Sequence, residues 1–168
     1  NLAARSLASG SSGAVGILLT AGLSHGMAST FSAIARAVRE RGDTFVLATA
    51  EGSDPESVRQ ALAHLHGHRV ATIVVLAQRA DILAILSSQR HRGPVVAIIS
   101  GQHEFSELST VSIDQARGAR LATEHLLAQG RSRLLHVTGD LSWQDASERL
   151  ASYQSVCAQA GVPGRWVG

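Results

Sequence analysis

Short runs rich in apolar residues alternate with longer stretches of helical periodicity along most of this 168-residue chain. The runs cover residues 15–19, 44–49, 70–77, 94–99 and 134–138. A strand that is apolar on both faces is buried on both, which is typical of a parallel sheet with helices on either side. The alternation therefore predicts an α/β fold built on a doubly wound parallel sheet.

The segments between these runs carry apolar residues on one helical face and have recognisable ends. Asp54 followed by Pro55 is a helix N-cap with proline in the first turn, and Asp114 is placed to cap a later helix. Gly42 and Gly130 are placed to end helices. The apolar stripes expected to be buried include Leu62 and Leu65, then Leu121 and Leu126, and finally Leu150, Tyr153 and Cys157.

A polar, irregular stretch at residues 101–109 interrupts the alternation. It predicts that the chain leaves one sheet there and starts another. We expect residues 14–112 to form a first subdomain and residues 113–168 to form part of a second. The second part offers about one strand and two helices, too little for an independent core, so we interpret it as truncated.

Composition narrows the class of protein further. The formal net charge of +2 is too small to indicate a nucleic-acid binder by itself. The single cysteine, Cys157, excludes an internal disulfide and suits a reducing cytoplasm. No apolar stretch approaches a membrane span, and residues 1–13 lack a signal-peptide core, so no membrane partner is expected. The glycines after the first strand lack G-x-G-x-x-G spacing, so no dinucleotide or other cofactor is expected.

Ser24 lies in a G-x-S-x-G sequence, TAGLSHG, directly after the first apolar run. This is the pattern of a serine nucleophile on a strand-to-helix turn. A hydrolase would also need an oxyanion hole from an earlier loop, but the residues before this strand are rich in Ser, Gly and Ala. A serine hydrolase using Ser24 is therefore the least favoured alternative, and we expect no catalytic residues.

Three histidines in the sequence HLHGH, at positions 64, 66 and 68, raise the question of a metal site. We expect Gly67 to end the helix between them, and no nearby Cys or acidic residue completes a ligand set. Histidines near a helix C-terminus are favourable to its dipole, so no metal is expected.

Ligands of doubly wound sheets bind at the carboxyl ends of the strands, which directs attention to the helix that follows Gly139. Arg149 offers fixed hydrogen-bond donors, Asp145 an acceptor and Trp143 an apolar face. The alternative is an exposed helix with an i, i+4 ion pair between Asp145 and Arg149. The residues alone leave both interpretations open.

Several segments in order resemble the LacI/GalR family of bacterial transcription regulators, across essentially the whole chain. They are NLAARSLASGSSGAVGILL at the start, GPVVAIIS at residues 93–100, VSIDQARGARLATEHLLAQGRSRLLHVTGD at residues 111–140 and ASERLASYQSVCAQAGV at residues 146–162. The resemblance implies a periplasmic-binding-protein-like fold, with a first effector-binding subdomain and the beginning of a second.

The resemblance also implies a DNA-binding hinge. Residues 1–13 would be a hinge helix and linker, in which Asn1, Ala4 and Leu7 contact the minor groove and Leu7 is wedged between base pairs. A helix-turn-helix headpiece would precede the hinge, and the rest of the second subdomain would follow Gly168. The implied protein is a cytoplasmic homodimer that binds operator DNA and acts as a repressor. A periplasmic-type solute-binding protein is the principal alternative.

A small-molecule effector, a sugar or another small metabolite, would bind between the two subdomains. Ile99 stands where many sugar-responsive members carry Asp, and Leu76 offers no hydrogen bond, so a monosaccharide is disfavoured. The residues that the resemblance and the chemistry above place at this effector site are Leu23, His25, Met27, Leu76, Ile99, Trp143, Asp145 and Arg149.

Overall fold

The computed structural model describes the chain except for residues 1–12, 21–24, 52–53, 78–79, 92 and 101–107. The chain divides into two compact units. Unit 1 comprises Asn1–Ile99 with Glu104–Val111, and unit 2 comprises Ser100–His103 with Ser112–Gly168. Each unit is described by itself.

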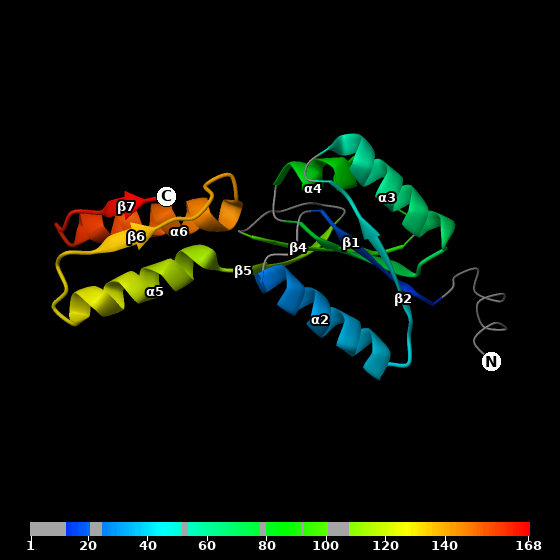
Figure 1. The fold of residues 1–168 in the computed structure, drawn as a ribbon, viewed down its shortest axis with the longest axis horizontal. Helices are drawn as coiled ribbons and strands as arrows, with labels where there is room; N and C mark the ends of the chain where they lie inside the picture. The colour runs from blue at the N-terminus through cyan, green and yellow to red at the C-terminus, as the bar shows by residue number, and fades with distance from the viewer. Residues whose placement is uncertain (1–12, 21–24, 52–53, 78–79, 92, 101–107) are drawn as a thin grey trace. The chain divides into compact units, whose positions relative to one another are not determined.

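Unit 1 is built on a five-stranded sheet with the strand order β2-β1-β3-β4-β5 (Figure 1). Strand β1 pairs in parallel with both β2 and β3, and β3 pairs in parallel with β4. These pairings confirm the predicted parallel sheet. The strands are β1 (Val15–Leu19), β2 (Phe45–Thr49), β3 (Thr72–Leu76), β4 (Val95–Ser100) and β5 (Ser109–Ile113).

Helices cover both faces of this sheet, as the apolar strands predict. Helix α2 (His25–Glu40) lies on one face, while α3 (Pro55–Gly67) and α4 (Ala80–Ser87) lie on the other (Figure 1). Met27 of α2 belongs to a core cluster with residues of β1 and β3. A larger cluster includes Leu62 of α3, which is fully buried. Unit 1 therefore has a packed core on each side of its sheet.

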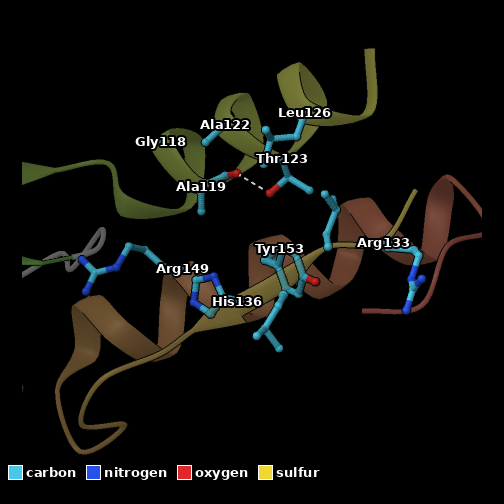
Figure 2. A pocket seen from close by; sticks show the side chains of 11 residues that line it. Gly118, Ala119, Ala122, Thr123, Leu126, Arg133, His136, Arg149 and Tyr153 are labelled. Carbon is cyan, nitrogen blue, oxygen red and sulfur yellow. Dashed lines mark hydrogen bonds between the residues drawn. The ribbon is translucent and has the colours of Figure 1, made fainter. Parts of the chain in front are cut away.

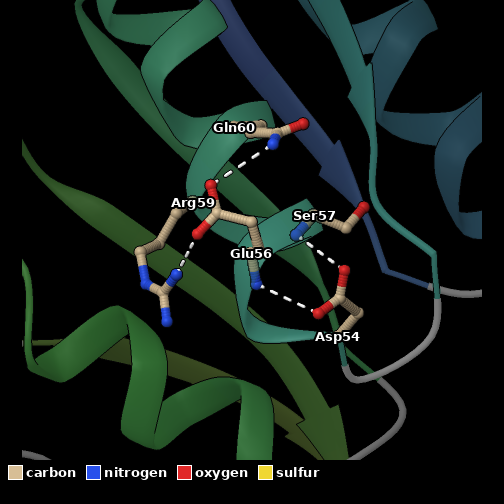
Figure 3. A network of polar contacts seen from close by, with 5 residues as sticks. All are labelled: Asp54, Glu56, Ser57, Arg59 and Gln60. Atoms are coloured by element: carbon tan, nitrogen blue, oxygen red, sulfur yellow. Dashed lines mark hydrogen bonds and ion pairs between the residues drawn. The ribbon is translucent and has the colours of Figure 1, made fainter.

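Helix α3 begins at the cap that the sequence predicts. The Asp54 carboxylate accepts hydrogen bonds from the backbone N–H groups of Glu56, at 3.2 Å, and Ser57, at 3.0 Å (Figure 3). Pro55 occupies the first turn, where its missing N–H group costs no hydrogen bond. The Glu56 side chain also pairs with Arg59 and accepts a bond from Gln60. The helix ends at Gly67, again as predicted.

The described part of unit 2 contains two long helices and two short strands. Helix α5 (Gln115–Ala128) precedes strand β6 (Leu135–Val137), and helix α6 (Gln144–Gln159) connects β6 to the parallel strand β7 (Arg165–Val167). The predicted Asp114 cap is confirmed, because its carboxylate accepts a bond from the Arg117 N–H group at 2.8 Å. Leu134, Leu150, Tyr153 and Cys157 form the core cluster of this unit.

Two expectations about unit 2 were wrong. The sequence suggested about one strand, but β7 is a second strand. It is only three residues long and follows Pro163 and Gly164, so it shows no periodicity of its own. It is a strand because it pairs with β6. The expected apolar stripe on α5 is also largely open to solvent, since Leu121 is 55% exposed and Leu126 is 44% exposed. The described part of unit 2 provides no second layer to cover that stripe.

The expected burial of Cys157 is confirmed. Cys157 is fully buried in the core of unit 2 rather than placed at a reactive surface. Among the residues that the structure describes, no helix combines the length and apolar character needed to cross a membrane.

Candidate functional site

The candidate site residues of unit 2 lie in the first turns of α6, which follows the loop after the carboxyl end of β6. Trp143 is the N-cap residue of α6 and has extended backbone angles, but its side chain makes no capping hydrogen bond. The Trp143 side chain is left 37% exposed. Its apolar ring is therefore partly exposed at the helix N-terminus, and its role at the effector site stays a prediction.

Asp145 and Arg149 lie one helical turn apart and are connected through a third residue, Gln115. Arg149 Nη1 donates to Gln115 Oε1 at 2.8 Å, and Gln115 Nε2 donates to Asp145 Oδ2 at 3.0 Å. The direct distance from Arg149 Nη1 to Asp145 Oδ2 is 3.9 Å. Asp145 and Arg149 thus form the i, i+4 ion pair of the alternative interpretation, and Gln115 bridges the two charged groups in addition.

Helix packing holds one side of this group in place, and the other side faces solvent. The Ser152 hydroxyl of α6 donates to the Ala116 carbonyl of α5 at 2.7 Å, which fastens the two helices next to Gln115. The side chains of Arg149 and Asp145 keep exposed fractions of 38% and 32%. Together they present donors and an acceptor side by side, which is suited to binding a ligand that carries hydroxyl or carboxylate groups.

A pocket of about 390 Å³ opens beside this group within unit 2 (Figure 2). Small residues of α5 line one wall, while Arg149 and Arg133 lie towards opposite ends (Figure 2). The pocket follows β6 and its preceding residues, and β6 pairs only with β7 in the described two-stranded sheet. It is lined by Gly118, Ala119, Ala122, Thr123, Leu126, Arg133, Leu134, Leu135, His136, Arg149 and Tyr153.

His136 and Tyr153 meet in this pocket as stacked rings, with centroids 5.0 Å apart and an interplanar angle of 23°. Burial lowers the pKa of His136, and the nearby positive charge of Arg149 lowers it further. Burial and the neighbouring Cys157 raise the pKa of Tyr153 to about 12. The Tyr153 hydroxyl donates to the Arg165 carbonyl at 3.0 Å, so this ring has a structural partner.

In unit 1, three of the predicted effector residues are core residues. Met27 is 8% exposed and Leu76 is 2% exposed, and both belong to the cluster on the α2 face. Ile99 is 7% exposed and packs in the cluster on the opposite face. Their side chains present little surface to a ligand, and their role at the effector site stays a prediction.

The structure does not describe the side chains of the other residues predicted in unit 1 and in the hinge. Leu23, Ser24 and the hinge residues Asn1, Ala4 and Leu7 lie outside the described part of the chain. His25 begins α2, but its side chain is likewise outside the description. Next to this segment, the buried Thr20 hydroxyl donates to the Leu76 carbonyl at 3.0 Å and so ties the carboxyl end of β1 to that of β3.

Four histidines of unit 1 form two pairs of neighbouring rings. The rings of His64 and His68 have centroids 4.4 Å apart, and those of His66 and His91 are 5.7 Å apart. Within the described residues, no group of three or more His, Cys, Asp or Glu side chains is placed to hold a metal ion. We therefore assign no metal-binding or other functional site to these two histidine pairs.

Sequence reasoning missed Gln115 and His136 as members of the candidate site. Gln115 directly follows a helix cap and lies 30 residues before Asp145, so no local motif connects the two. His136 is a single polar residue within a short strand. The packing of α5 beside α6 reveals Gln115, and the stacking of the His136 ring on Tyr153 of α6 reveals His136.

Comparison with known proteins gives consistent matches along the chain. The model of the family described as "Periplasmic binding proteins and sugar binding domain of LacI family" matches residues 13–167. The HTH-type transcriptional regulator GalR of Escherichia coli (strain K12) is 29% identical over 138 residues, which are 79% of this chain and 39% of that protein.

Solved structures give the same fold. The Lac repressor dimer bound to operator and the anti-inducer ONPF matches with a TM-score of 0.80 at 22% identity, over 99% of this chain and 58% of that chain. A periplasmic binding protein/LacI transcriptional regulator from Alkaliphilus metalliredigens QYMF, complexed with D-xylulofuranose, matches with a TM-score of 0.70 at 22% identity, over 92% of this chain and 56% of that chain. The chain spans less than two thirds of each of these proteins.

Proposed function

Because this chain belongs to the family of periplasmic binding proteins and LacI-type sugar-binding domains, we propose that it is the effector-binding and dimerisation region of a DNA-binding transcriptional repressor. The family match over residues 13–167 is the observation that carries the proposal. The named relative GalR is a transcriptional regulator, which favours a cytoplasmic regulator over an enzyme or an exported solute-binding protein.

The effector of this proposal is a small polar metabolite. Arg149 and Asp145 supply charged hydrogen-bonding groups that are partly exposed, and Trp143 supplies an apolar surface beside them. A ligand of this kind shifts the protein between conformational states only if it binds one state more tightly than the other. Operator DNA would contact the hinge residues Asn1, Ala4 and Leu7 and an upstream headpiece, in a homodimer.

A crossed mutational experiment on the full-length protein tests the proposal. Arg149→Ala removes charge-assisted hydrogen bonds worth about 1.5–3 kcal/mol, so effector affinity should fall roughly ten- to hundredfold while operator affinity stays near wild type. Leu7→Ala should weaken operator binding and leave effector affinity nearly intact. Calorimetric titration with D-xylulose and with ONPF, the ligands of the two matching structures, measures effector affinity, and D-xylulose should be the weaker probe because Leu76 and Ile99 offer a monosaccharide no hydrogen bond. A mobility-shift assay with DNA from the protein's own promoter region measures operator affinity.

Arg131→Ala is the matched control, because Arg131 is an exposed arginine of unit 2 outside the bridged group. It should leave both affinities unchanged. If Arg131→Ala and Arg149→Ala weaken effector binding equally, the assignment of Arg149 to the effector site is wrong. The gene sequence upstream of residue 1 provides a separate check: a helix-turn-helix segment supports the regulator, whereas a secretory signal supports the solute-binding alternative.

A further inference from the structure

Gln115 occupies a position from which one side chain reaches two residues of the neighbouring helix. It is the first residue of α5, held by the Asp114 cap, and its half-buried side chain points to α6. Its amide oxygen accepts from Arg149, 34 residues later, and its amide nitrogen donates to Asp145, 30 residues later. Both ends of the amide are therefore occupied by charged residues of the candidate effector site.

An uncharged amide is chemically suited to this place. Asn and Gln are the side chains that carry a fixed acceptor and a fixed donor on one planar group. A carboxylate at position 115 would repel Asp145, and a cation would repel Arg149. The direct separation of 3.9 Å between Arg149 Nη1 and Asp145 Oδ2 exceeds a good hydrogen bond, so the amide maintains the spacing between the two charges.

The Gln115 bridge leaves N–H donors of Arg149 available to a ligand. A guanidinium has five N–H donors, and Gln115 engages it through Nη1. The Arg149 side chain is 38% exposed, so further donors face solvent in a fixed orientation. Long, flexible side chains lose rotamer freedom when a ligand immobilises them, and a residue that has already restrained them reduces that loss.

We propose that Gln115 is a positioning residue, which holds Arg149 and Asp145 in the arrangement that binds effector. This inference rests on the proposed effector-binding function. It assigns no effector contact to Gln115 itself. The effect of Gln115 on affinity passes through the orientation of the two charged side chains.

Gln115→Met is the direct test, because methionine has a similar length and no amide. Immobilising one long side chain costs about 0.5–1.5 kcal/mol on binding, so effector affinity should fall roughly two- to twelvefold. Gln154→Met is the matched control, since Gln154 is an exposed glutamine on α6. It should bind D-xylulose and ONPF as the wild type does.

A second readout follows Arg149 without any ligand. The charge of Arg149 contributes to the lowered pKa of His136, alongside burial, while Tyr153 stacks on the ring and Arg133 lines the same pocket. Gln115→Met should release Arg149 and let the pKa of His136 rise part of the way towards its value in Arg149→Ala. NMR titration of histidine-labelled full-length protein, with His136→Gln to assign the resonance, measures this change.

The two readouts separate the possible outcomes. A raised His136 pKa together with weakened effector binding supports the positioning role. An unchanged His136 pKa overturns it, as does unchanged affinity for a probe that the wild type binds. If the His136 pKa rises but the wild type binds neither D-xylulose nor ONPF, Gln115 does position Arg149, and the failure belongs to the proposed effector class.

Discussion

Units 1 and 2 use the same β–α alternation but differ in how completely they bury it. In unit 1 the sheet has core clusters on both faces, and Ile17 and Leu18 of its strand β1 are fully buried. In unit 2, Leu135 and Val137 of strand β6 are 62% and 73% exposed. Strand β6 packs against α6 through His136, while its neighbours on either side in the sequence face solvent.

The polar residues of the candidate site belong to the less completely packed unit. Within the described residues, unit 1 therefore buries more of its apolar side chains than unit 2 does. Both tryptophans, Trp143 and Trp166, lie in unit 2, so tryptophan fluorescence follows unit 2 while far-UV circular dichroism follows both units.

The largest expected effect is in the core of unit 1. Leu62→Ala removes a fully buried side chain from the α3 face and should destabilise the protein by about 2–5 kcal/mol. Leu135→Ala, at a side chain 62% exposed in unit 2, should change stability by less than about 0.5 kcal/mol. Urea unfolding followed by circular dichroism measures both variants. Equal losses would contradict the contrast in packing between the units.

The next largest expected difference in stability is between two glycine substitutions, one in each unit. A Cβ atom at Gly93 of unit 1 would collide with the backbone carbonyl oxygen of Ala71, so Gly93→Ala should cost about 1–3 kcal/mol. A Cβ atom at Gly118, inside α5 of unit 2, has no neighbour within 4 Å, so Gly118→Ala should stabilise that helix by about 0.5–1 kcal/mol. Thermal unfolding measures the two shifts, whose opposite signs are the test.

Helix caps provide a third comparison. Asp54 caps α3 with two hydrogen bonds, and Asp54→Ala should cost about 1 kcal/mol. Trp143 begins α6 without a side-chain cap, so Trp143→Asp should stabilise unit 2 by about 1 kcal/mol and weaken effector binding through loss of the ring. Chemical unfolding followed by the remaining Trp166 fluorescence measures the gain. A loss of stability in Trp143→Asp would show that the tryptophan supports the fold instead.

The sequence predicted the sheet of unit 1 because both of its signals are local. Continuous apolar runs identify buried strands, and residues such as Asp54 and Gly67 set the helix ends. The same reasoning failed for Leu121 and Leu126, since an apolar stripe indicates a face that can be buried without saying what covers it. Strand β7 was missed because three residues are too few to show a period.

The candidate site was predictable only where its residues are near in sequence. Asp145 and Arg149 are one turn apart, and their pairing with a helix N-terminus follows from the pattern. Gln115 joins them through the packing of α5 beside α6, which no spacing along the chain encodes. Leu76, which was expected at the effector site, packs with Met27 in the core cluster on the α2 face, and its role at that site stays a prediction.

The smallest expected effect is the pH dependence of unit 2. Burial and Arg149 lower the pKa of His136 below its ordinary value of 6.5, so the unfolded chain takes up a proton more readily than the folded unit. Stability should therefore fall as pH drops from above 6.5 through the lowered pKa, and be retained at higher pH. Urea unfolding by tryptophan fluorescence at about pH 7.5 and 5.5 measures this fall. His136→Phe keeps an aromatic ring on Tyr153 without a titrating group and should reduce the fall, as should Arg149→Ala, which removes one of its two causes. An equal fall in wild type and His136→Phe would assign the acid sensitivity of unit 2 to groups other than His136.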